Sequence, residues 1–372
     1  MTEPRGARLW LLRAGLLLPV LAVLLLLELG ARLHAWYSDH TLQRGLDGVG
    51  LGPDADDLSL QHIIRWHDNP RIIYELIPGL SGEFRGHRLT ISEQGFRGPP
   101  VPLPKPPGTL RIVGIGDSVM FGWGVGDDEH YLARLGEHLG AALPERRVDW
   151  VNAAAPGYNT VNEVETLKTR LLAYDPDVVI VDYVSNDLYV PGFLRRPQPY
   201  FSLDRSFLAQ LVRNALDGLH VPDNELERPP DAFRHRTFLG EEDLIPEAYR
   251  EVIGIDAFRA AIGELTGLSR AHGFPVIVFA HHGFDAPVRA VLEASGLPLI
   301  DGYPAIRAWL DDRGIADYAG SPLTVSARDS HPSAVQHALI AGMLTDAVLG
   351  ELGLVSARRS SKVSGLHEGE IP

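Results

Sequence analysis

The chain of 372 residues contains no cysteine. Disulfide bonds, thiolate zinc sites, cysteine nucleophiles and lipidation of a cysteine behind a signal sequence are therefore all excluded. Cationic residues are also in deficit, with 34 Lys and Arg against 48 Asp and Glu, which gives a formal net charge of −14. That balance argues against binding nucleic acid, because such binding relies on lysines and arginines that displace counterions from phosphates.

Loops that hold nucleotides are missing as well. Gly114 and Gly116 begin a dinucleotide fingerprint, but Val119 stands where the third glycine is needed. The Gly-Lys-Ser/Thr sequence of a phosphate-binding loop does not occur in the chain. The remaining composition, 45% apolar and 22% charged, is ordinary for a globular protein of one large or two small domains. A nucleotide-binding protein is thereby disfavoured, and binding of FMN or a dinucleotide would be needed to support it.

One long apolar run occurs, at Leu9–Leu29. The cationic residues before it or just inside it are Arg5, Arg8 and Arg13. A helix of about 20 apolar residues crosses the hydrocarbon layer of a bilayer, and arginines on its N-terminal side favour a cytoplasmic N-terminus. We therefore predict a transmembrane signal anchor within residues 1–35 of a single-pass protein, with the rest of the chain on the exported, periplasmic or extracellular side of the cytoplasmic membrane. A buried core helix and a signal peptide cleaved near Gly30 are the alternatives.

Three further segments lack the pattern of a regular domain. Residues 36–107 predict a stalk and a small irregular region of short strands and turns. This region ends at Pro99–Gly108, whose six prolines exclude a helix or a central strand. An insertion rich in Pro, Arg and Asp is predicted at about 188–246, with one helix near 206–219. Residues 356–372 have no periodicity and predict a disordered tail.

Residues 108–355 alternate short apolar runs with amphipathic stretches. The runs are typical of strands buried on both faces. Strands are predicted at 110–116, 147–152, 177–184, 275–280 and 297–301. Helices are predicted at 129–143, 160–173, 257–272 and 333–352. This alternation predicts an α/β domain with a central parallel sheet of about five strands, covered by helices on both faces.

Polar residues follow these strands at the edge where parallel α/β sheets place their chemistry. Ser118 lies in the turn directly behind the first predicted strand. Near the end of the domain, Asp329 precedes His331 by two residues, and Pro332 predicts the first turn of the helix that follows. A serine hydroxyl attacks an ester only with the help of a base such as histidine, oriented by a carboxylate. Taken singly, Ser118 is explained as a helix cap, and the Asp-x-His as a surface histidine with a capping carboxylate.

Two further turns at strand ends supply hydrogen-bond donors. Gly157 follows the second predicted strand, and Asn186 follows the third. The Gly157 N–H and the Asn186 side-chain amide are candidates to join the Ser118 N–H in an oxyanion hole. Trp123, just behind the serine turn, is interpreted as a pocket-lining or core aromatic residue. Three polar strand ends in order, with a late Asp-x-His-Pro, together predict a serine hydrolase.

The segments GIGDSVMFGWGV, NAAAPGYNT, VSND and DSHPSAVQHALIA resemble the four blocks of the SGNH/GDSL hydrolase superfamily, in the expected order. The resemblance covers roughly residues 108–352 apart from the insertion. It implies a three-layer, flavodoxin-like α/β/α sandwich with Ser118 as nucleophile, His331 as base, and Gly157 and Asn186 in the oxyanion hole. The third block lacks the glycine of Gly-x-Asn-Asp. Many members carry the acid three residues before the histidine, where this chain has arginine, so Asp329 fits the Asp-x-His-Pro variant.

The resemblance implies a serine-dependent ester hydrolase that acts through an acyl-enzyme on an O-acylated glycan or lipid outside the cytoplasmic membrane. Such an enzyme needs no metal and no organic cofactor. Its expected partners are the acyl-ester substrate and, through the N-terminal helix, the membrane, but not nucleic acid. An O-acyltransferase acting on a cell-surface glycan with the same triad remains an alternative, as does a catalytically inactive SGNH domain that binds glycans or serves as a scaffold. The sequence predicts no oligomeric state.

Overall fold

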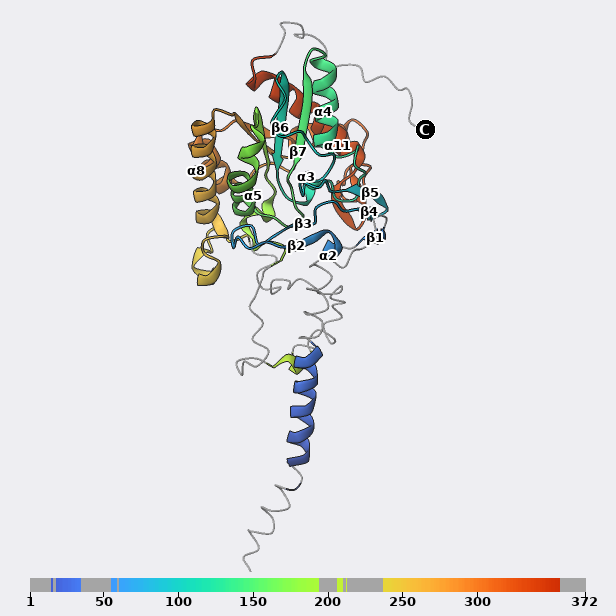
Figure 1. The fold of residues 1–372 in the computed structure, drawn as a ribbon, viewed down its shortest axis with the longest axis vertical. Helices are drawn as coiled ribbons and strands as arrows, with labels where there is room; N and C mark the ends of the chain where they lie inside the picture. The colour runs from blue at the N-terminus through green and yellow to red at the C-terminus, as the bar shows by residue number, and fades with distance from the viewer. Residues whose placement is uncertain are drawn as a thin grey trace, which may run out of the picture. The chain divides into compact units, whose positions relative to one another are not determined.

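The computed structural model describes residues 15, 18–34, 55–58, 60–193, 206–209, 212 and 237–354. Contacts between Cα atoms divide the chain into two compact units, Met1–Gly52 with Leu194–Arg228, and Pro53–Phe193 with Pro229–Pro372. The second unit contains all the strands labelled in Figure 1. It contains the predicted domain of residues 108–355 apart from Leu194–Arg228, which belong to the predicted insertion and fall in the first unit.

The second unit is built around a five-stranded parallel sheet. Its strands are β6 Thr109–Ile115, β7 Arg147–Asn152, β8 Val178–Asp182, β9 Val276–Ala280 and β10 Leu299–Asp301. They lie in the order β10-β9-β8-β6-β7, so the chain starts inside the sheet, goes to one edge at β7 and then crosses to the other side of β6. This order is that of flavodoxin-like sheets, and it puts a topological switch point between β6 and β8. The predicted α/β class with about five parallel strands is confirmed.

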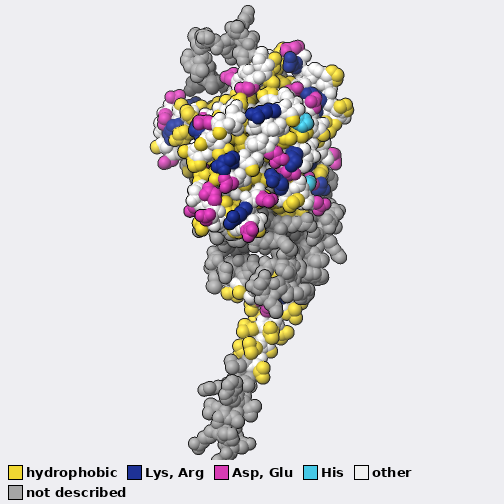
Figure 2. All heavy atoms as spheres, turned by 90° about the vertical axis from the view of Figure 1, so that its left-hand side faces the viewer, with side chains coloured by type: hydrophobic (Ala, Val, Ile, Leu, Met, Phe, Trp, Pro, Cys, Tyr) yellow, Lys and Arg dark blue, Asp and Glu magenta, His cyan; other side chains and the backbone are white. Residues whose placement is uncertain are grey.

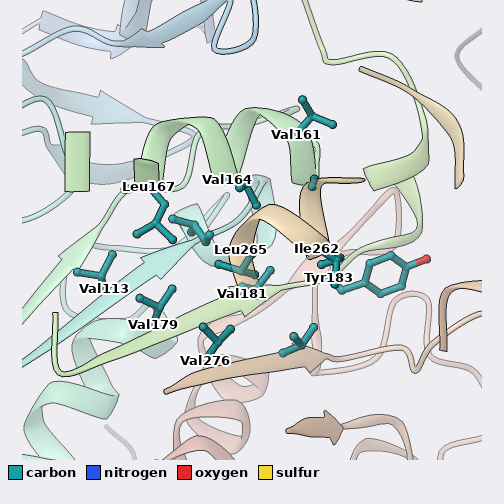
Figure 3. Packing of buried hydrophobic residues seen from close by; sticks show 14 of the residues in the cluster. Val113, Val161, Val164, Leu167, Val179, Val181, Tyr183, Ile262, Leu265 and Val276 are labelled. Carbon is teal, nitrogen blue, oxygen red and sulfur yellow. The ribbon is translucent and has the colours of Figure 1, made fainter. Parts of the chain in front are cut away.

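Strand β6 shows how alternate residues face the two sides of the sheet. Val113 pairs with Val151 of β7 and with Val179 of β8, and all three side chains belong to one buried cluster (Figure 3). Gly114 faces the opposite side, where a Cβ atom would lie only 2.9 Å from Leu132. It would also lie 2.6 Å from Met120 Sδ, so glycine leaves room for these two side chains against the strand.

Helices cover both faces of the sheet (Figure 1). One face carries α5 Thr160–Thr166, α8 Gly254–His272 and α9 Ala286–Ser295, whose buried apolar side chains share a cluster with the strands. The other face carries α4 Tyr131–Ala142 and α11 Ala334–Glu351. Figure 2 shows acidic and basic side chains interspersed over the outer surface on the α8 side. The three layers bury the sheet on both faces, which is why its strands read as continuous apolar runs.

Residues 55–98, which precede β6 in the chain, form a small subdomain of short elements. Its elements are β1 Ala55–Leu58, α2 Leu60–Ile63, β2 Ile64–Trp66, β3 Tyr74–Leu76, β4 Ser81–Phe84 and β5 His87–Thr90. Strands β2 and β3 pair antiparallel, and β4 lies between β1 and β5. Arg85 and Gly86 join β4 to β5 with φ angles of +55° and +81°, the left-handed pair that a two-residue hairpin turn requires. A β-bridge from Arg97 to Asn152 connects the subdomain to the end of β7.

Most predicted elements agree with the structure, with a few differences at their ends. The helix predicted over 160–173 is α5 followed by a π-helical turn at Leu167–Leu171 and a 3-10 turn at Leu172–Tyr174. The prediction that Pro332 lies in the first turn of the last helix is wrong. Pro332 ends the short strand β12 Asp329–Pro332, which pairs with β11 Thr324–Ser326, and α11 begins at Ala334 behind the capping residue Ser333. Helices α9 and α10 Tyr303–Asp311 were not predicted.

In the first unit, residues 18–34 are helical and expose large apolar side chains, with Leu25 and Leu26 69% and 68% exposed. Glu28 accepts hydrogen bonds from the Ser206 hydroxyl and from the N–H groups of Phe207 and Leu208. Within the described ranges, no helix is both long and apolar enough to span a membrane. Residues 9–14, 16 and 17 of the predicted anchor, the tail 356–372 and most of the predicted helix 206–219 lie outside the described residues. The anchor stays a prediction.

Candidate active site

Ser118 is the first residue of a short helix, α3 Ser118–Phe121, which follows directly behind β6. Asp117 caps this helix, because its Oδ1 accepts a hydrogen bond of 2.8 Å from the N–H of Val119. A Cβ atom on Gly116 would lie 2.8 Å from Met120 and 3.0 Å from Asp182. The turn therefore needs glycine before the capping aspartate, and it presents the half-buried Ser118 at the carboxyl end of the sheet.

His331 and Asp329 reach the same point from strand β12. His331 Nε2 lies 2.9 Å from Ser118 Oγ, and His331 Nδ1 lies 2.6 Å from Asp329 Oδ1. The N–H of His331 also donates to Asp329 Oδ1, at 3.1 Å. The carboxylate thus accepts a hydrogen bond from Nδ1–H, which leaves Nε2 with a lone pair directed at the serine hydroxyl. The three residues that the sequence proposed as nucleophile, base and acid are in hydrogen-bond contact.

The ionised form of Asp329 is favoured in this arrangement. Partial burial pushes the pKa of Asp329 upward, but hydrogen bonds from the side chain and N–H of His331 and from Trp123 outweigh it and hold the pKa below its ordinary value. A carboxylate that stays charged can stabilise the imidazolium that forms when His331 takes up a proton. The acid is therefore suited to its place beside the histidine over the neutral pH range.

Trp123 holds the second oxygen of the acid, a role that the sequence did not reveal. Its indole Nε1 donates to Asp329 Oδ2 at 3.1 Å, while its ring stacks on the His331 imidazole with centroids 5.3 Å apart and planes at 25°. One side chain thus contacts both members of the pair, its hydrogen bond fixing the carboxylate and its ring limiting rotation of the imidazole. The sequence indicated only that Trp123 lies close to Ser118 in the chain. That proximity could not distinguish a contact with the acid from a place in the lining of the pocket.

Asn186 lies beside the nucleophile in a 3-10 turn, Ser185–Leu188, that follows β8. Its side-chain Nδ2 donates to Asp117 Oδ2 at 2.8 Å, and Ser118 Oγ lies 3.3 Å from the same oxygen. One N–H of the amide is therefore engaged by the capping aspartate, and the other remains the candidate oxyanion donor. Asp117, which the sequence analysis gave no role, orients both the helix start and this amide.

Gly157 follows β7 in a tight turn and has a φ angle of +79°. Its N–H donates to no backbone carbonyl of the described residues. A Cβ atom here would lie 2.8 Å from the Cα of Gly192, so both the backbone conformation and the space require glycine. The structure thus brings three candidate oxyanion donors, from Ser118, Gly157 and Asn186, to the carboxyl ends of three neighbouring strands.

Three more carboxyl groups are buried around the nucleophile turn. Burial raises the pKa of Asp182, Asp187 and Glu163 well above the ordinary values, and repulsion from neighbouring carboxylates adds to the effect. Hydroxyl groups donate to two of them, Tyr131 to Asp182 and Thr160 to Asp187, each at 2.8 Å. The neutral form of these acids is favoured, which limits the negative charge beneath the serine.

No group of three or more His, Cys, Asp or Glu side chains in the described part of the chain is arranged to hold a metal ion. The adjacent His281 and His282, the pair most open to misreading as metal ligands, contact each other with ring centroids 4.0 Å apart. Burial lowers the pKa of His281 well below its ordinary value, so this ring is neutral in the core. The chemistry that the site can support is carried by its hydroxyl, imidazole, carboxylate and amide groups.

Comparison with known proteins agrees with this geometry. The model of the GDSL-like lipase/acylhydrolase family matches residues 115–339, a stretch that includes Ser118, Gly157, Asn186, Asp329 and His331. The match covers more than half of the chain and begins after the subdomain of residues 55–98. No curated protein matches the chain.

Solved structures similar to this chain include LAE5, an alpha/beta hydrolase enzyme from the metagenome of Lake Arreo, Spain. It is 18% identical over 67% of this chain and 97% of its own, with a TM-score of 0.38. An R55A mutant of Axe2, an acetyl-xylooligosaccharide esterase from Geobacillus stearmophilus, is 17% identical over 67% of this chain and 97% of its own, with a TM-score of 0.37. A lipase/acylhydrolase from Enterococcus faecalis is 18% identical over 65% and 96%, with a TM-score of 0.35.

The family predicted from the four sequence segments is thus the family that matches. The matched residues 115–339 contain the nucleophile turn, both remaining oxyanion candidates and the Asp-x-His strand. The chain belongs to the GDSL-like lipase/acylhydrolase family and is an ester-hydrolysing enzyme.

Proposed function

We propose that the protein is a serine esterase in which Ser118 is the nucleophile, His331 the general base and Asp329 the residue that orients the base. The observation that carries the proposal is the continuous chain of contacts from Asp329 Oδ1 through His331 to Ser118 Oγ, at 2.6 and 2.9 Å. The N–H groups of Ser118 and Gly157 and the amide of Asn186 serve as the oxyanion hole.

The reaction proceeds in two acyl transfers. His331 Nε2 removes the hydroxyl proton as Ser118 Oγ forms a bond to the ester carbonyl carbon, and the carbonyl oxygen becomes an oxyanion. When the intermediate collapses, the bond to the alcohol oxygen breaks and His331 returns the proton to the leaving alcohol. Water, deprotonated by His331, then attacks the acyl-enzyme, which releases the carboxylic acid and restores Ser118.

As the substrate class we propose O-acyl esters of a glycan or a lipid outside the cytoplasmic membrane. This location rests on the apolar run Leu9–Leu29 and on the arginines before it, which support a single-pass anchor with the catalytic unit exported. Resistance of the full chain to extraction from membranes at alkaline pH is expected. Release into the soluble fraction would refute the anchor but would not bear on the proposed esterase mechanism.

Turnover of nitrophenyl acetate, butyrate and octanoate by the purified full chain, beside Ser118→Ala, tests the activity. Loss of the serine is expected to lower kcat by about 10⁶-fold, because the base and the acid act only through that hydroxyl. The preferred chain length separates a short-acyl glycan esterase from a lipid esterase. Turnover that persists in Ser118→Ala would refute the proposed nucleophile. Acyl transfer to an added sugar in place of hydrolysis would assign the enzyme as an O-acyltransferase.

A further inference from the structure

The peptide that carries the Gly157 N–H is held by a residue from outside the family match. The hydroxyl of Tyr74, in strand β3 of the subdomain, donates to the carbonyl oxygen of Pro156 at 2.8 Å. This carbonyl and the Gly157 N–H belong to one planar trans peptide, so they point in opposite directions. A hydrogen bond that fixes the direction of the carbonyl therefore also fixes the direction of the N–H.

The other side of Gly157 is held as well. The N–H of Gly192 donates to the carbonyl oxygen of Gly157 at 2.7 Å, and the two glycines approach so closely that a Cβ on either would meet the Cα of the other within 3.1 Å. A Cβ on Gly157 would also lie 3.1 Å from the Tyr74 hydroxyl. Tyr74 and Gly192 thus restrain the two peptides that flank the Gly157 Cα.

Tyr74 is itself firmly placed. Its side chain is fully buried, and its ring packs against Tyr158 and Phe193 with centroids 5.1 and 5.3 Å away. The Tyr158 hydroxyl donates to the main-chain carbonyl of Tyr74. Burial raises the pKa of the Tyr74 hydroxyl well above its ordinary value, so it remains a proton donor. The restraint on the Pro156 carbonyl is therefore rigid and independent of pH over the working range.

We infer that Tyr74 is a positioning residue for the oxyanion hole, and that the subdomain of residues 55–98 is in this way a part of the catalytic apparatus. The inference rests on the proposed function, in which the Gly157 N–H stabilises the oxyanion. Donors that are oriented before the reaction cost no reorganisation when charge develops, which is the source of their effect on rate. Tyr74 touches neither substrate nor the reacting atoms, and it acts only through the Pro156–Gly157 peptide.

The test compares Tyr74→Phe with Tyr183→Phe in the full chain. Each change removes the hydroxyl of one buried tyrosine, but that of Tyr183 donates to Asp285 at the start of α9, so only Tyr74→Phe frees the Pro156 carbonyl. We expect Tyr74→Phe to lower kcat for nitrophenyl butyrate about tenfold at unchanged KM, less than the 10²–10³-fold that loss of an oxyanion donor causes. Tyr183→Phe is expected to keep kcat within about twofold, although both variants lose a buried tyrosine hydrogen bond.

A second measurement does not depend on the choice of ester. A fluorophosphonate labels Ser118 as the Oγ–P bond forms, the P–F bond breaks, fluoride leaves and His331 takes the proton. Because the phosphonyl oxygen occupies the oxyanion hole, labelling by Tyr74→Phe is expected to slow about tenfold, with the pH profile of kcat/KM unchanged. Replacing Tyr74 by 4-aminophenylalanine, which keeps a donor at that position, is expected to restore most of the rate.

The outcomes separate the inference from the proposed function. Equal rates for Tyr74→Phe and the unchanged protein, or equal losses in Tyr74→Phe and Tyr183→Phe, would overturn the positioning role while leaving the esterase intact. Failure of 4-aminophenylalanine to restore the rate in a folded protein would also overturn it. Absence of any Ser118-dependent labelling or turnover in the unchanged protein would refute the proposed function itself, and with it the role of Gly157.

Discussion

The sheet domain and the subdomain of residues 55–98 contribute different things to one site. Ends of the sheet's strands carry the groups proposed to react or to bind the oxyanion, with Ser118 behind β6 and Gly157 behind β7. The subdomain instead supplies buried side chains that bond to the loops bearing those groups. The contrast shows that reactive residues and the residues that hold them in place can come from different parts of a chain.

Arg97 is the strongest example on the subdomain side. Its fully buried guanidinium donates to the carbonyl oxygens of Phe121, Gly122 and Val125, the last two at 2.7 Å. Burial lowers the pKa of Arg97 to about 10, while the nearby Asp127 acts in the opposite direction, so the group stays charged at neutral pH. One side chain therefore satisfies three carbonyls of the loop that follows the nucleophile helix.

The hairpin turn of the subdomain reaches the same loop from outside. Arg85 lies over the Trp123 ring, 4.5 Å from its centroid, and Phe84 packs edge-on against that ring at 5.1 Å. Trp123 in turn contacts both His331 and Asp329. The acid and base of the sheet domain are thus supported by the subdomain through one tryptophan.

After the loss of Ser118, the largest expected effect also belongs to the sheet domain. Asp329→Asn should lower kcat by about 10⁴-fold, because an amide at this position can donate to Nδ1 and favour the wrong tautomer of His331. Thermal stability should change little, since the side chain is partly exposed and similar in shape. Steady-state kinetics with nitrophenyl butyrate and a thermal melt measure the two effects. An activity within tenfold of the unchanged protein would assign the acid elsewhere.

The second prediction concerns the contribution of the subdomain to the stability of the protein. Arg97→Met leaves the buried carbonyl groups of Phe121 and Val125 without a donor, while that of Gly122 keeps the N–H of Val125, and each unsatisfied group costs roughly 1–3 kcal/mol. We expect the free energy of unfolding to fall by at least about 2 kcal/mol in urea titrations. The matched control is Arg88→Met, an exposed arginine of the same subdomain, which should stay within about 0.5 kcal/mol. Equal stabilities of the two variants would contradict a structural role for the buried guanidinium.

The smallest expected effect tests the contact between Trp123, which the subdomain supports, and Asp329 of the sheet domain. Trp123→Phe keeps an aromatic ring beside His331 but removes the hydrogen bond to Asp329 Oδ2. That bond is one of the causes that lower the pKa of Asp329, so its loss should raise this pKa. An NMR titration of the Asp329 carboxyl should then show its pKa moved upward, and kcat should fall about tenfold because a less firmly held carboxylate orients His331 less well. An unchanged titration of Asp329 with unchanged kcat would show that the contact does not position the acid.

Much of the sheet domain was predictable because its signals are local. Strands β8 and β9 read as short apolar runs, and the observed β7 has the predicted ends, 147–152. The strand β12 was not predicted, because its pairing with β11 across a short turn leaves no apolar period in Asp329-Ser330-His331-Pro332. Helices α9 and α10 were missed, although each has a proline in its first turn.

Some features of the active site could be predicted from the sequence, and others became known only from the structure. From the sequence alone came the parallel α/β fold and the proposal of Ser118 as nucleophile and His331 as base, since apolar runs and strand-end motifs are written in consecutive residues. The proposal of Asp329 as the acid gains support from the structure, where its Oδ1 lies 2.6 Å from His331 Nδ1 and also accepts the His331 N–H. The roles of Tyr74, Arg97 and Trp123 were decided by the tertiary structure alone. Tyr74 and Trp123 contact residues 82 and 206 positions away, and the three carbonyls that Arg97 bonds are 24 to 28 positions away, separations at which no local pattern specifies the partner.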